Sequence, residues 1–171
     1  GSKVINLSDG HDEYLQYLNE ITDINFENFK IVIDAANGAA FDVIEKFLES
    51  ANAKYRIINN SPNGQNINDN CGATSPENLQ NEIKPREIGA SFDGDADRLI
   101  MIDEEGNIVN GDLILTLLAK YFAELNKLEN NIVVSTVMSN YGFKQAMEKF
   151  EFDLIETPVG DKYVEEAMNK Y

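Results

Sequence analysis

Hydrophobic and polar positions recur with two periods along the chain, and these periods outline its elements. Residues 12–21, DEYLQYLNEI, place apolar side chains at helical spacing, which predicts an amphipathic helix. The segment KIVIDAANGAAFDVIEKFLESANAKYRIIN has apolar runs at 31–33 and 55–58 and an Asn37-Gly38 turn. This pattern predicts a strand, a turn, a helix and a second strand. Because such units pair their strands in parallel through a right-handed crossover, we expect a parallel sheet.

A long polar loop, NSPNGQNINDNCGATSPE, spans residues 60–77. Loops of this length in compact domains are usually functional. A short helix is predicted at its end, with Ser75 as the N-cap and Pro76 at the first position. We interpret Cys71 as a small packed turn residue, because no neighbour in the sequence would lower its pKa.

The second half of the chain restarts the alternation of helices and strands. A strand is expected at 88–92, then a hairpin with its turn at 105–107, a helix at 111–125, a strand within 130–140, a helix at 141–150, a strand at 152–159 and a final helical pattern. Tyr121 and Phe122, at helical spacing, are expected in a core or at a domain contact. The fold class predicted is α/β, with two consecutive α/β units of mixed, largely parallel sheets packed by helices. We place these units at residues 1–107 and 108–171.

Composition narrows the choice of partners. The formal net charge is −16, the pI is about 4.3, and no basic patch is visible, which argues against binding to nucleic acid or to an anionic membrane surface. No apolar run approaches the roughly 20 residues of a membrane span. Cys71 is the single cysteine, which excludes a disulfide framework and favours a cytoplasmic location.

One stretch, SFDGDADRL at residues 91–99, concentrates the candidate chemistry. Asp93, Asp95 and Asp97 alternate with small residues, and two such charges at 4 Å repel by about 1 kcal/mol even in water. Alternate side chains of an extended segment point to one side, and Gly94 lets the backbone curl. Oxygen ligands without His or Cys favour Mg²⁺, with Ca²⁺ or Mn²⁺ as alternatives. Arg98 would either neutralise the carboxylates or hold a phosphate oxygen beside the metal.

Three other interpretations of this stretch are weaker. An EF-hand loop needs glycine at its sixth position, where this chain has Arg98, and it needs two flanking helices. An aspartyl-phosphate phosphatase site leaves Asp97 unexplained and needs a further acidic pair downstream. A solvated turn does not account for the regular spacing. The Asn37-Gly38 turn is not a dinucleotide site, because G-x-G-x-x-G is absent. A metal beside an arginine at a strand end suits phosphoryl transfer, where catalysis is mainly positioning and charge stabilisation.

The motif FDGDADR resembles the metal-binding loop of the α-D-phosphohexomutases. Four further segments, in the same order, are similar to the phosphoglucosamine mutase branch of that family. They are VIDAANGAA (32–40), NINDNCGATSPENLQ (66–80), TVMSN (136–140) and VGDKYVEEAM (159–168). The resemblance covers nearly the whole chain beyond its first dozen or so residues.

The resemblance implies a site and a reaction. Family members have four domains around a cleft, a phosphoserine in domain 1, and Mg²⁺ held by three aspartates of domain 2. The resemblance therefore implies that Asp93, Asp95 and Asp97 are metal ligands and that Arg98 lies close to the phosphoserine. It also implies Asp161 and Lys162 as substrate-binding residues of a sugar-facing loop of domain 3. The branch usually has arginine where this chain has Lys162, and lysine cannot make a bidentate fork.

The resemblance also leads us to expect a fragment: domain 2 plus the first part of domain 3. No Ser-His-Asn-Pro phosphoserine segment is present. The Gly-Ser start, taken as a cloning scar, and the unfinished last helix agree with this. The intact protein would interconvert glucosamine 6-phosphate and glucosamine 1-phosphate, with domains 1 and 4 of the same chain as partners and a hexosamine phosphate as substrate, whereas the fragment would be inactive. The alternatives are a phosphoglucomutase or phosphomannomutase of the same fold, and a non-catalytic metal-binding acidic module. Thr136 and Ser139 either line the cleft or belong to a simple turn.

Overall fold

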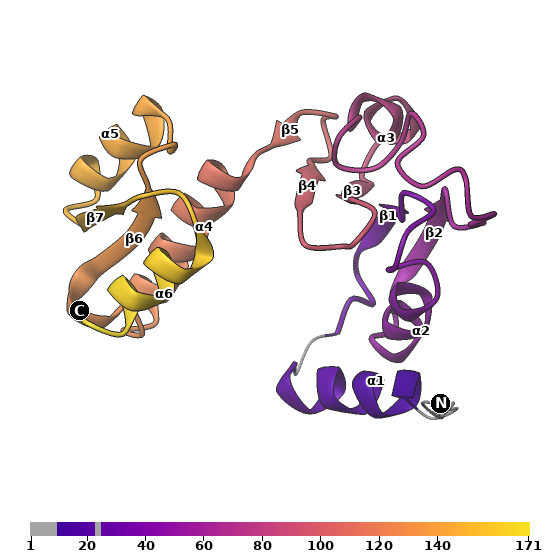
Figure 1. Ribbon diagram of the computed structural model, residues 1–171, viewed down its shortest axis with the longest axis horizontal. Helices are drawn as coiled ribbons and strands as arrows, with labels where there is room; N and C mark the ends of the chain where they lie inside the picture. The colour runs from indigo at the N-terminus through magenta and orange to yellow at the C-terminus, as the bar shows by residue number, and fades with distance from the viewer. Residues whose placement is uncertain (1–9, 23–24) are drawn as a thin grey trace, which may run out of the picture. The chain divides into compact units, whose positions relative to one another are not determined.

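A computed structural model describes residues 10–22 and 25–171. It divides the chain into two compact units, Gly1–Val109 and Asn110–Tyr171, which we call the N-terminal and the C-terminal unit (Figure 1). Gly1 and Ser2, expected to be a cloning scar, lie outside the described residues. Each unit combines helices with at least one parallel strand pair, so the α/β fold class is confirmed.

The N-terminal unit is built on a five-stranded sheet in the order β2-β1-β3-β4-β5. Strand β1 is parallel to both of its neighbours, whereas the pairs β3–β4 and β4–β5 are antiparallel. The parallel pair β1–β2 and the hairpin β4–β5 confirm the sequence prediction. The elements are α1 (Gly10–Ile21), β1 (Lys30–Asp34), α2 (Val43–Ser50), β2 (Lys54–Ile58), α3 (Glu77–Glu82), β3 (Ile88–Phe92), β4 (Leu99–Ile102) and β5 (Ile108–Val109).

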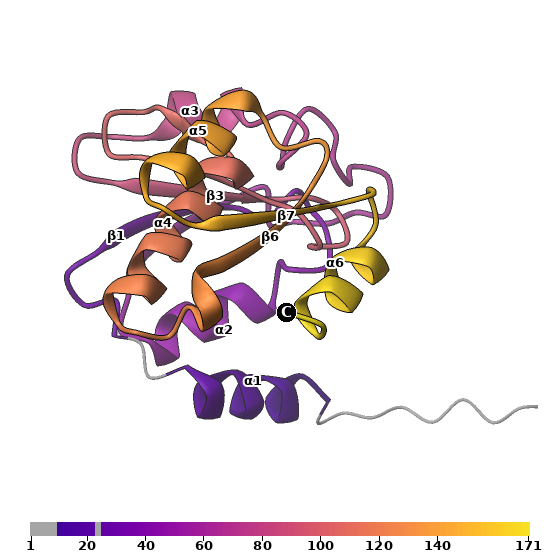
Figure 2. The same cartoon turned by 90° about the vertical axis from the view of Figure 1, so that its left-hand side faces the viewer.

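Strand β1 is buried on both faces, which explains its continuous apolar run. On one face Ile31 and Ile33 pack with Leu48 of α2. On the other face Val32 packs with Leu79 of α3 and with β4. Helix α1 lies alongside α2 (Figure 2), where the Ser50 hydroxyl donates a hydrogen bond of 2.9 Å to Asn19 Oδ1.

The predicted start of α3 is off by one residue. Pro76, not Ser75, stands at the N-cap position, and no side chain caps the helix there. The Pro76 carbonyl instead accepts a hydrogen bond of 2.9 Å from the Gln80 amide. A proline needs no partner for its missing N–H at a helix start, so the position suits it.

The C-terminal unit contains one parallel strand pair, β6–β7. Its elements are α4 (Gly111–Glu124), a 3₁₀ turn (Glu129–Asn131), β6 (Ile132–Thr136), α5 (Tyr141–Lys149), β7 (Asp153–Thr157) and α6 (Asp161–Met168). Figure 2 shows β6 and β7 side by side. The buried core gathers residues of α4, β6 and α5, namely Ala119, Val133, Phe143 and Met147. Asn110 and Asn140 cap α4 and α5, because each side-chain oxygen accepts a hydrogen bond from the backbone three residues on.

Helix α4 leaves much of its apolar surface exposed. Tyr121 and Phe122, expected in a core or at a domain contact, are about half exposed, with ring centroids 5.9 Å apart. The described residues include no helix long and apolar enough to cross a bilayer.

Candidate metal-binding site

The three aspartates lie at the tip of the β3–β4 hairpin, in residues 93–97, which we call the acidic loop. One carboxylate oxygen from each of Asp93, Asp95 and Asp97 lies within 4.8 Å of the others. The convergence comes from a tight turn and not from the extended segment that we expected. The Asp93 carbonyl accepts a hydrogen bond of 3.0 Å from the Ala96 amide, and Ala96 adopts a left-handed φ of 63°.

Arg98 binds the innermost of these carboxylates. Asp93 is fully buried, whereas Asp95 and Asp97 are exposed. Asp93 Oδ2 accepts a hydrogen bond of 2.7 Å from Arg98 Nε, and Asp93 Oδ1 accepts one of 3.1 Å from the Arg98 amide. Arg98 Nε is also 3.6 Å from Asp97 Oδ1. The Arg98 side chain is still two-thirds exposed, so part of its guanidinium remains free to meet an anion.

The pKa shifts of the carboxylates differ in direction along the acidic loop. Burial acts to raise the pKa of Asp93, but the hydrogen bonds and the charge of Arg98 outweigh burial and hold this pKa below its ordinary value. Repulsion from Asp95, then burial and the charge of Asp93, raise the pKa of Asp97. The hydrogen bond to Asp93 raises the pKa of Arg98. The outer part of the loop therefore carries negative charge that its neighbours do not fully balance, and such charge attracts a cation.

Close packing explains the glycines beside the loop. A Cβ on Gly38 would lie 2.3 Å from the Gly94 carbonyl oxygen, and a Cβ on Gly94 would lie 2.7 Å from Ile67 and Asn68. Gly94 does not have a positive φ. Our expectation that Gly94 supplies the curl was therefore wrong, since Ala96 adopts the left-handed conformation and Gly94 is needed for space.

Two backbone hydrogen bonds hold the acidic loop from outside. The Ala39 amide donates to the Gly94 carbonyl and the Ala73 amide donates to the Phe92 carbonyl, both at 2.8 Å. Ala39 follows β1 and Ala73 belongs to the long loop before α3. These segments meet at the carboxyl ends of the parallel strands, where open α/β sheets bind ligands. These donors could not be identified from the sequence, because a backbone N–H has no residue signature.

Asp161 and Lys162 lie in the C-terminal unit, at the first two positions of α6. Both side chains are exposed. Lys162 Nζ lies 3.8 Å from Glu166 Oε1, an i,i+4 pair on the helix surface. Gly160, at the N-cap position, has a φ of 138°, a conformation that favours glycine.

A cavity of about 500 Å³ lies at the carboxyl end of β6. Thr136 and Ser139, which were left open between a cleft and a turn, both line it, and the Ser139 amide also donates to the Thr136 carbonyl at 3.0 Å. The Asp112 carboxylate accepts a hydrogen bond of 2.9 Å from the Asn140 amide beside it.

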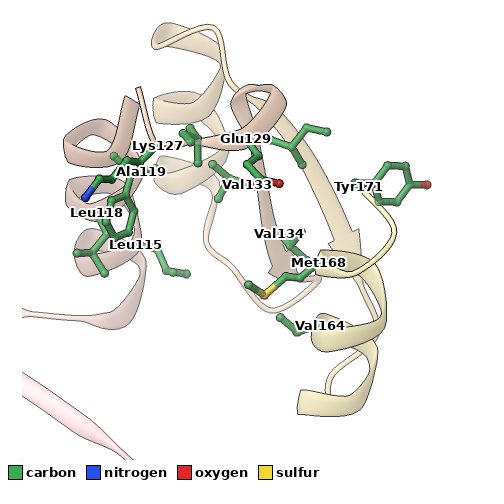
Figure 3. Close-up of a pocket in the computed structure, with 13 residues that line it drawn as sticks. Leu115, Leu118, Ala119, Lys127, Glu129, Val133, Val134, Val164, Met168 and Tyr171 are labelled. Atoms are coloured by element: carbon green, nitrogen blue, oxygen red, sulfur yellow. The ribbon is translucent and has the colours of Figure 1, made fainter. Parts of the chain in front are cut away.

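An apolar groove of about 460 Å³ follows β6, and we call it the β6 groove (Figure 3). Leu115 and Leu118 of α4 line one side, and Val164 and Met168 of α6 line the other. Val134 of β6 also lines the groove.

The burial of Cys71 confirms that it is a packed residue of the loop, as the sequence predicted. Its side chain is 2% exposed, and burial, followed by the charges of Asp34 and Asp69, raises the pKa of the thiol. A thiol with a raised pKa is a poor nucleophile at neutral pH.

Two family models match the chain in succession. Residues 12–106 match domain II of phosphoglucomutases and phosphomannomutases, and residues 110–171 match their alpha/beta/alpha domain III. The chain belongs to this family. Among its members, the phosphoglucosamine mutase of Clostridium kluyveri is 42% identical over 99% of this chain and 38% of its own length. That of Shouchella clausii is 44% identical over 95% of this chain and 37% of its own length.

Solved structures agree with the family. An N-acetylglucosamine-phosphate mutase in its apo form is 27% identical, with a TM-score of 0.69 over 93% of this chain and 38% of that one. A phosphoglucomutase/phosphomannomutase family protein from Burkholderia thailandensis, 24% identical, shares the fold with a TM-score of 0.75 over 94% of this chain and 35% of that one. The chain spans about 38% of the length of the curated relatives that it matches.

Proposed function

We propose that this chain forms the metal-binding part of a phosphoglucosamine mutase. In this proposal Asp93, Asp95 and Asp97 hold Mg²⁺, and Arg98 lies beside the phosphoryl group that is transferred. The observation that carries the proposal is the convergence of three carboxylate oxygens within 4.8 Å. The names and identities of the curated relatives support the choice of branch.

The donor set suits a hard divalent cation. All three groups offer carboxylate oxygens, and neither His nor Cys belongs to the cluster, which matches the preference of Mg²⁺ for oxygen ligands. The raised pKa of Asp97, caused first by repulsion from Asp95, is what a bound cation would relieve. Arg98 keeps Asp93 ionised and oriented through two hydrogen bonds.

In the longer protein, the reaction would interconvert glucosamine 6-phosphate and glucosamine 1-phosphate through a phosphoserine and a sugar bisphosphate. The bound metal would stabilise negative charge on the phosphoryl oxygens. Asp93 would keep the Arg98 side chain in place, and Arg98 would pair with a phosphoryl oxygen through its exposed guanidinium edge. We further propose that Asp161 and Lys162 contact the sugar phosphate from their exposed positions at the start of α6.

A titration with Mn²⁺ tests the metal site on this chain alone, read by electron paramagnetic resonance. We expect one saturable site, competed by Mg²⁺ and abolished in Asp95→Asn. Asp95 is exposed, so this substitution should leave the fold intact. Asp153→Asn, which removes an exposed carboxylate at the start of β7, is the matched control. Equal binding by both variants would refute the metal assignment.

A mutase assay on the longer protein tests the reaction. The substrates are glucosamine 6-phosphate, glucose 1-phosphate and mannose 1-phosphate, with Mg²⁺ and a sugar bisphosphate primer. The 171-residue chain, which we expect to be inactive, is the control. Turnover of the amino sugar supports the proposed branch. A preference for another sugar would keep the family and replace the branch, and no turnover at all would leave a non-catalytic metal-binding module.

A further inference from the structure

We propose that Asp34 is a positioning residue for the acidic loop. Asp34 ends β1, touches none of the three aspartates through a hydrogen bond, and fixes the two segments that grip their loop. The effect on metal binding rests on the function proposed above, whereas the effect on the loop backbone can be measured without any metal.

Asp34 is fully buried, with an exposed fraction of 0%. Its Oδ1 accepts hydrogen bonds from the Ala36 amide at 2.9 Å and from Asn59 Nδ2 at 3.0 Å, and its Oδ2 accepts one from the Gly72 amide at 2.8 Å. Within the described residues it has no Lys or Arg at ion-pair distance. One carboxylate therefore joins three segments that are far apart in the sequence, and it does so only through N–H donors.

The segments that Asp34 joins are the same segments that hold the acidic loop. Ala36 lies three residues before Ala39, whose amide donates to Gly94, and Gly72 directly precedes Ala73, whose amide donates to Phe92. The two acceptor carbonyls, Phe92 and Gly94, flank Asp93 on either side. Asp34 thus determines the spacing of the two donors between which the innermost carboxylate is placed.

Further backbone hydrogen bonds fix the turn after β1, and one of them involves Asn59, the third partner of Asp34. The Asn59 carbonyl accepts a hydrogen bond of 2.6 Å from the Asn37 amide, and the Ala36 carbonyl accepts one of 2.9 Å from the Asn68 amide. Asn68 also lies against Gly94, because a Cβ at Gly94 would meet its side-chain nitrogen. The turn after β1 is therefore fixed on both sides.

A carboxylate is the side chain that this position requires. Three N–H groups point at two oxygens, so an asparagine would place an NH₂ group against at least one donor. A buried charge without a cation is unfavourable unless hydrogen bonds satisfy it. An apolar core residue would avoid that burden, and we infer that Asp34 is present for the geometry of the loop.

Amide exchange read by NMR on the 171-residue chain tests the inference, with Asp34→Asn against Leu48→Ala. Leu48 packs with Ile31 and Ile33 on one face of the sheet, and its side chain makes no hydrogen bond, so its truncation destabilises the unit without removing any of the three donors. We expect faster exchange of the Ala39 and Ala73 amides in Asp34→Asn than in Leu48→Ala, at a temperature where both variants are folded. We also expect Mn²⁺ affinity to fall about tenfold in Asp34→Asn only, as is typical when a residue that supports metal ligands is lost.

Equal exchange at these two amides in both variants would overturn the inference, and so would unchanged Mn²⁺ affinity in a variant whose loop has loosened. If the wild-type chain shows no saturable site, the proposed metal function fails and the exchange rates alone decide the role of Asp34. Asn59→Gly is a second variant in case Asp34→Asn does not fold. It removes one donor to Asp34, keeps the Asn59 carbonyl, and suits the positive φ of 51° at that position. We expect it to change exchange in the same direction but less, and no change would overturn the inference.

Discussion

The two units follow the same order of elements around their first parallel strand, but they surround that strand differently. In the N-terminal unit, β1 has β2 on one edge and β3 on the other. In the C-terminal unit, β6 pairs only with β7 among the described residues, and the apolar β6 groove follows it. Parallel strands are usually covered on both faces and paired on both edges. Strand β1 meets this description, whereas β6, in the described part of the chain, does not.

The two strands also differ in the number of segments that meet at their carboxyl ends. Parallel strands on both sides of β1 bring three polar segments to one edge of the sheet, and two of them donate the backbone hydrogen bonds that hold the acidic loop. With one neighbour, β6 places fewer segments at its carboxyl end, where the structure has an open cavity. The number of strands beside the first parallel strand therefore sets how many segments meet at its carboxyl end, even when the elements have the same order.

The largest expected effects test whether each unit has a core on one face or on two. Leu48→Ala and Leu79→Ala truncate fully buried side chains on opposite faces of β1, so each should lower the free energy of unfolding by about 2–5 kcal/mol. Met147→Ala should cost a similar amount in the C-terminal unit, whereas Val164→Ala on α6, a helix without a buried residue, should cost about 1 kcal/mol or less. Urea unfolding followed by NMR reports each unit separately. A large loss in Val164→Ala would show that the second face of β6 is a complete core.

The next effect tests the close fit of the strand-end segments. Gly38→Ala places a Cβ 2.3 Å from the Gly94 carbonyl oxygen, and overpacking of this kind costs about 1–3 kcal/mol. Gly111→Ala, at the start of α4, meets nothing within 4 Å and should stabilise its unit by about 0.4–1 kcal/mol. Thermal unfolding of both variants makes the comparison. A tolerated Gly38→Ala would mean that the loops around the acidic site can move apart.

A smaller effect depends on pH. The hydrogen bond from Arg56, at 3.0 Å, lowers the pKa of Glu87, so this glutamate stabilises the fold above its unfolded pKa of about 4.3. That contribution is lost as the pH falls toward the lowered value in the folded state. Glu87→Gln should cost about 1 kcal/mol at pH 7, after allowance for the partial exposure of Arg56, and the difference from wild type should shrink below pH 4.

The control for the pH experiment is Glu156→Gln in the C-terminal unit. Its ion pair with Lys144 is 2.5 Å long and about one-third exposed on both sides, so we expect a loss of about 0–1 kcal/mol. Urea unfolding at a series of pH values measures both variants. A constant difference between Glu87→Gln and wild type down to pH 3 would contradict the role given to Arg56.

The smallest effect concerns the β6 groove. Leu118 lines it and is 44% exposed, so Leu118→Lys should change the stability of the 171-residue chain by no more than about 0.5 kcal/mol. Chemical denaturation at low protein concentration is the measurement. A loss of several kcal/mol would show that the groove is filled and that β6 is as well covered as β1.

Local patterns predicted most of the fold. The strand at 88–92 and both strand–helix–strand units follow from the spacing of apolar residues, because each strand or helix shows its own period. The prediction of the Ser75 cap was wrong, since one position separates the N-cap from the first turn and proline fits either side of that boundary. The groove beside β6 could not be predicted, because it depends on which strands pair.

The carboxylates of the acidic loop could be singled out from the sequence, whereas the residues that support the loop could not. Asp93, Asp95 and Asp97 stand out because like charges recur at a fixed spacing, although the turn at Ala96 that brings them together left no such mark. Asp34 resembles any polar residue at a strand end. Its partners Asn59 and Gly72 are distant in the sequence, so only the fold shows that they meet.

The distance along the chain between paired strands has a consequence for the order of folding. Strand β6 pairs Ile132 with Asp153, whereas β1 pairs Ile31 with Ile88. Pairing over a longer stretch of chain closes a larger loop and is slower. The pairing of β6 with β7 should therefore form early in folding, and the pairing of β1 with β3 should form later. The proposed binding of a cation should then appear in the last kinetic phase of refolding, because the segments that hold the acidic loop are not assembled until β3 has paired with β1.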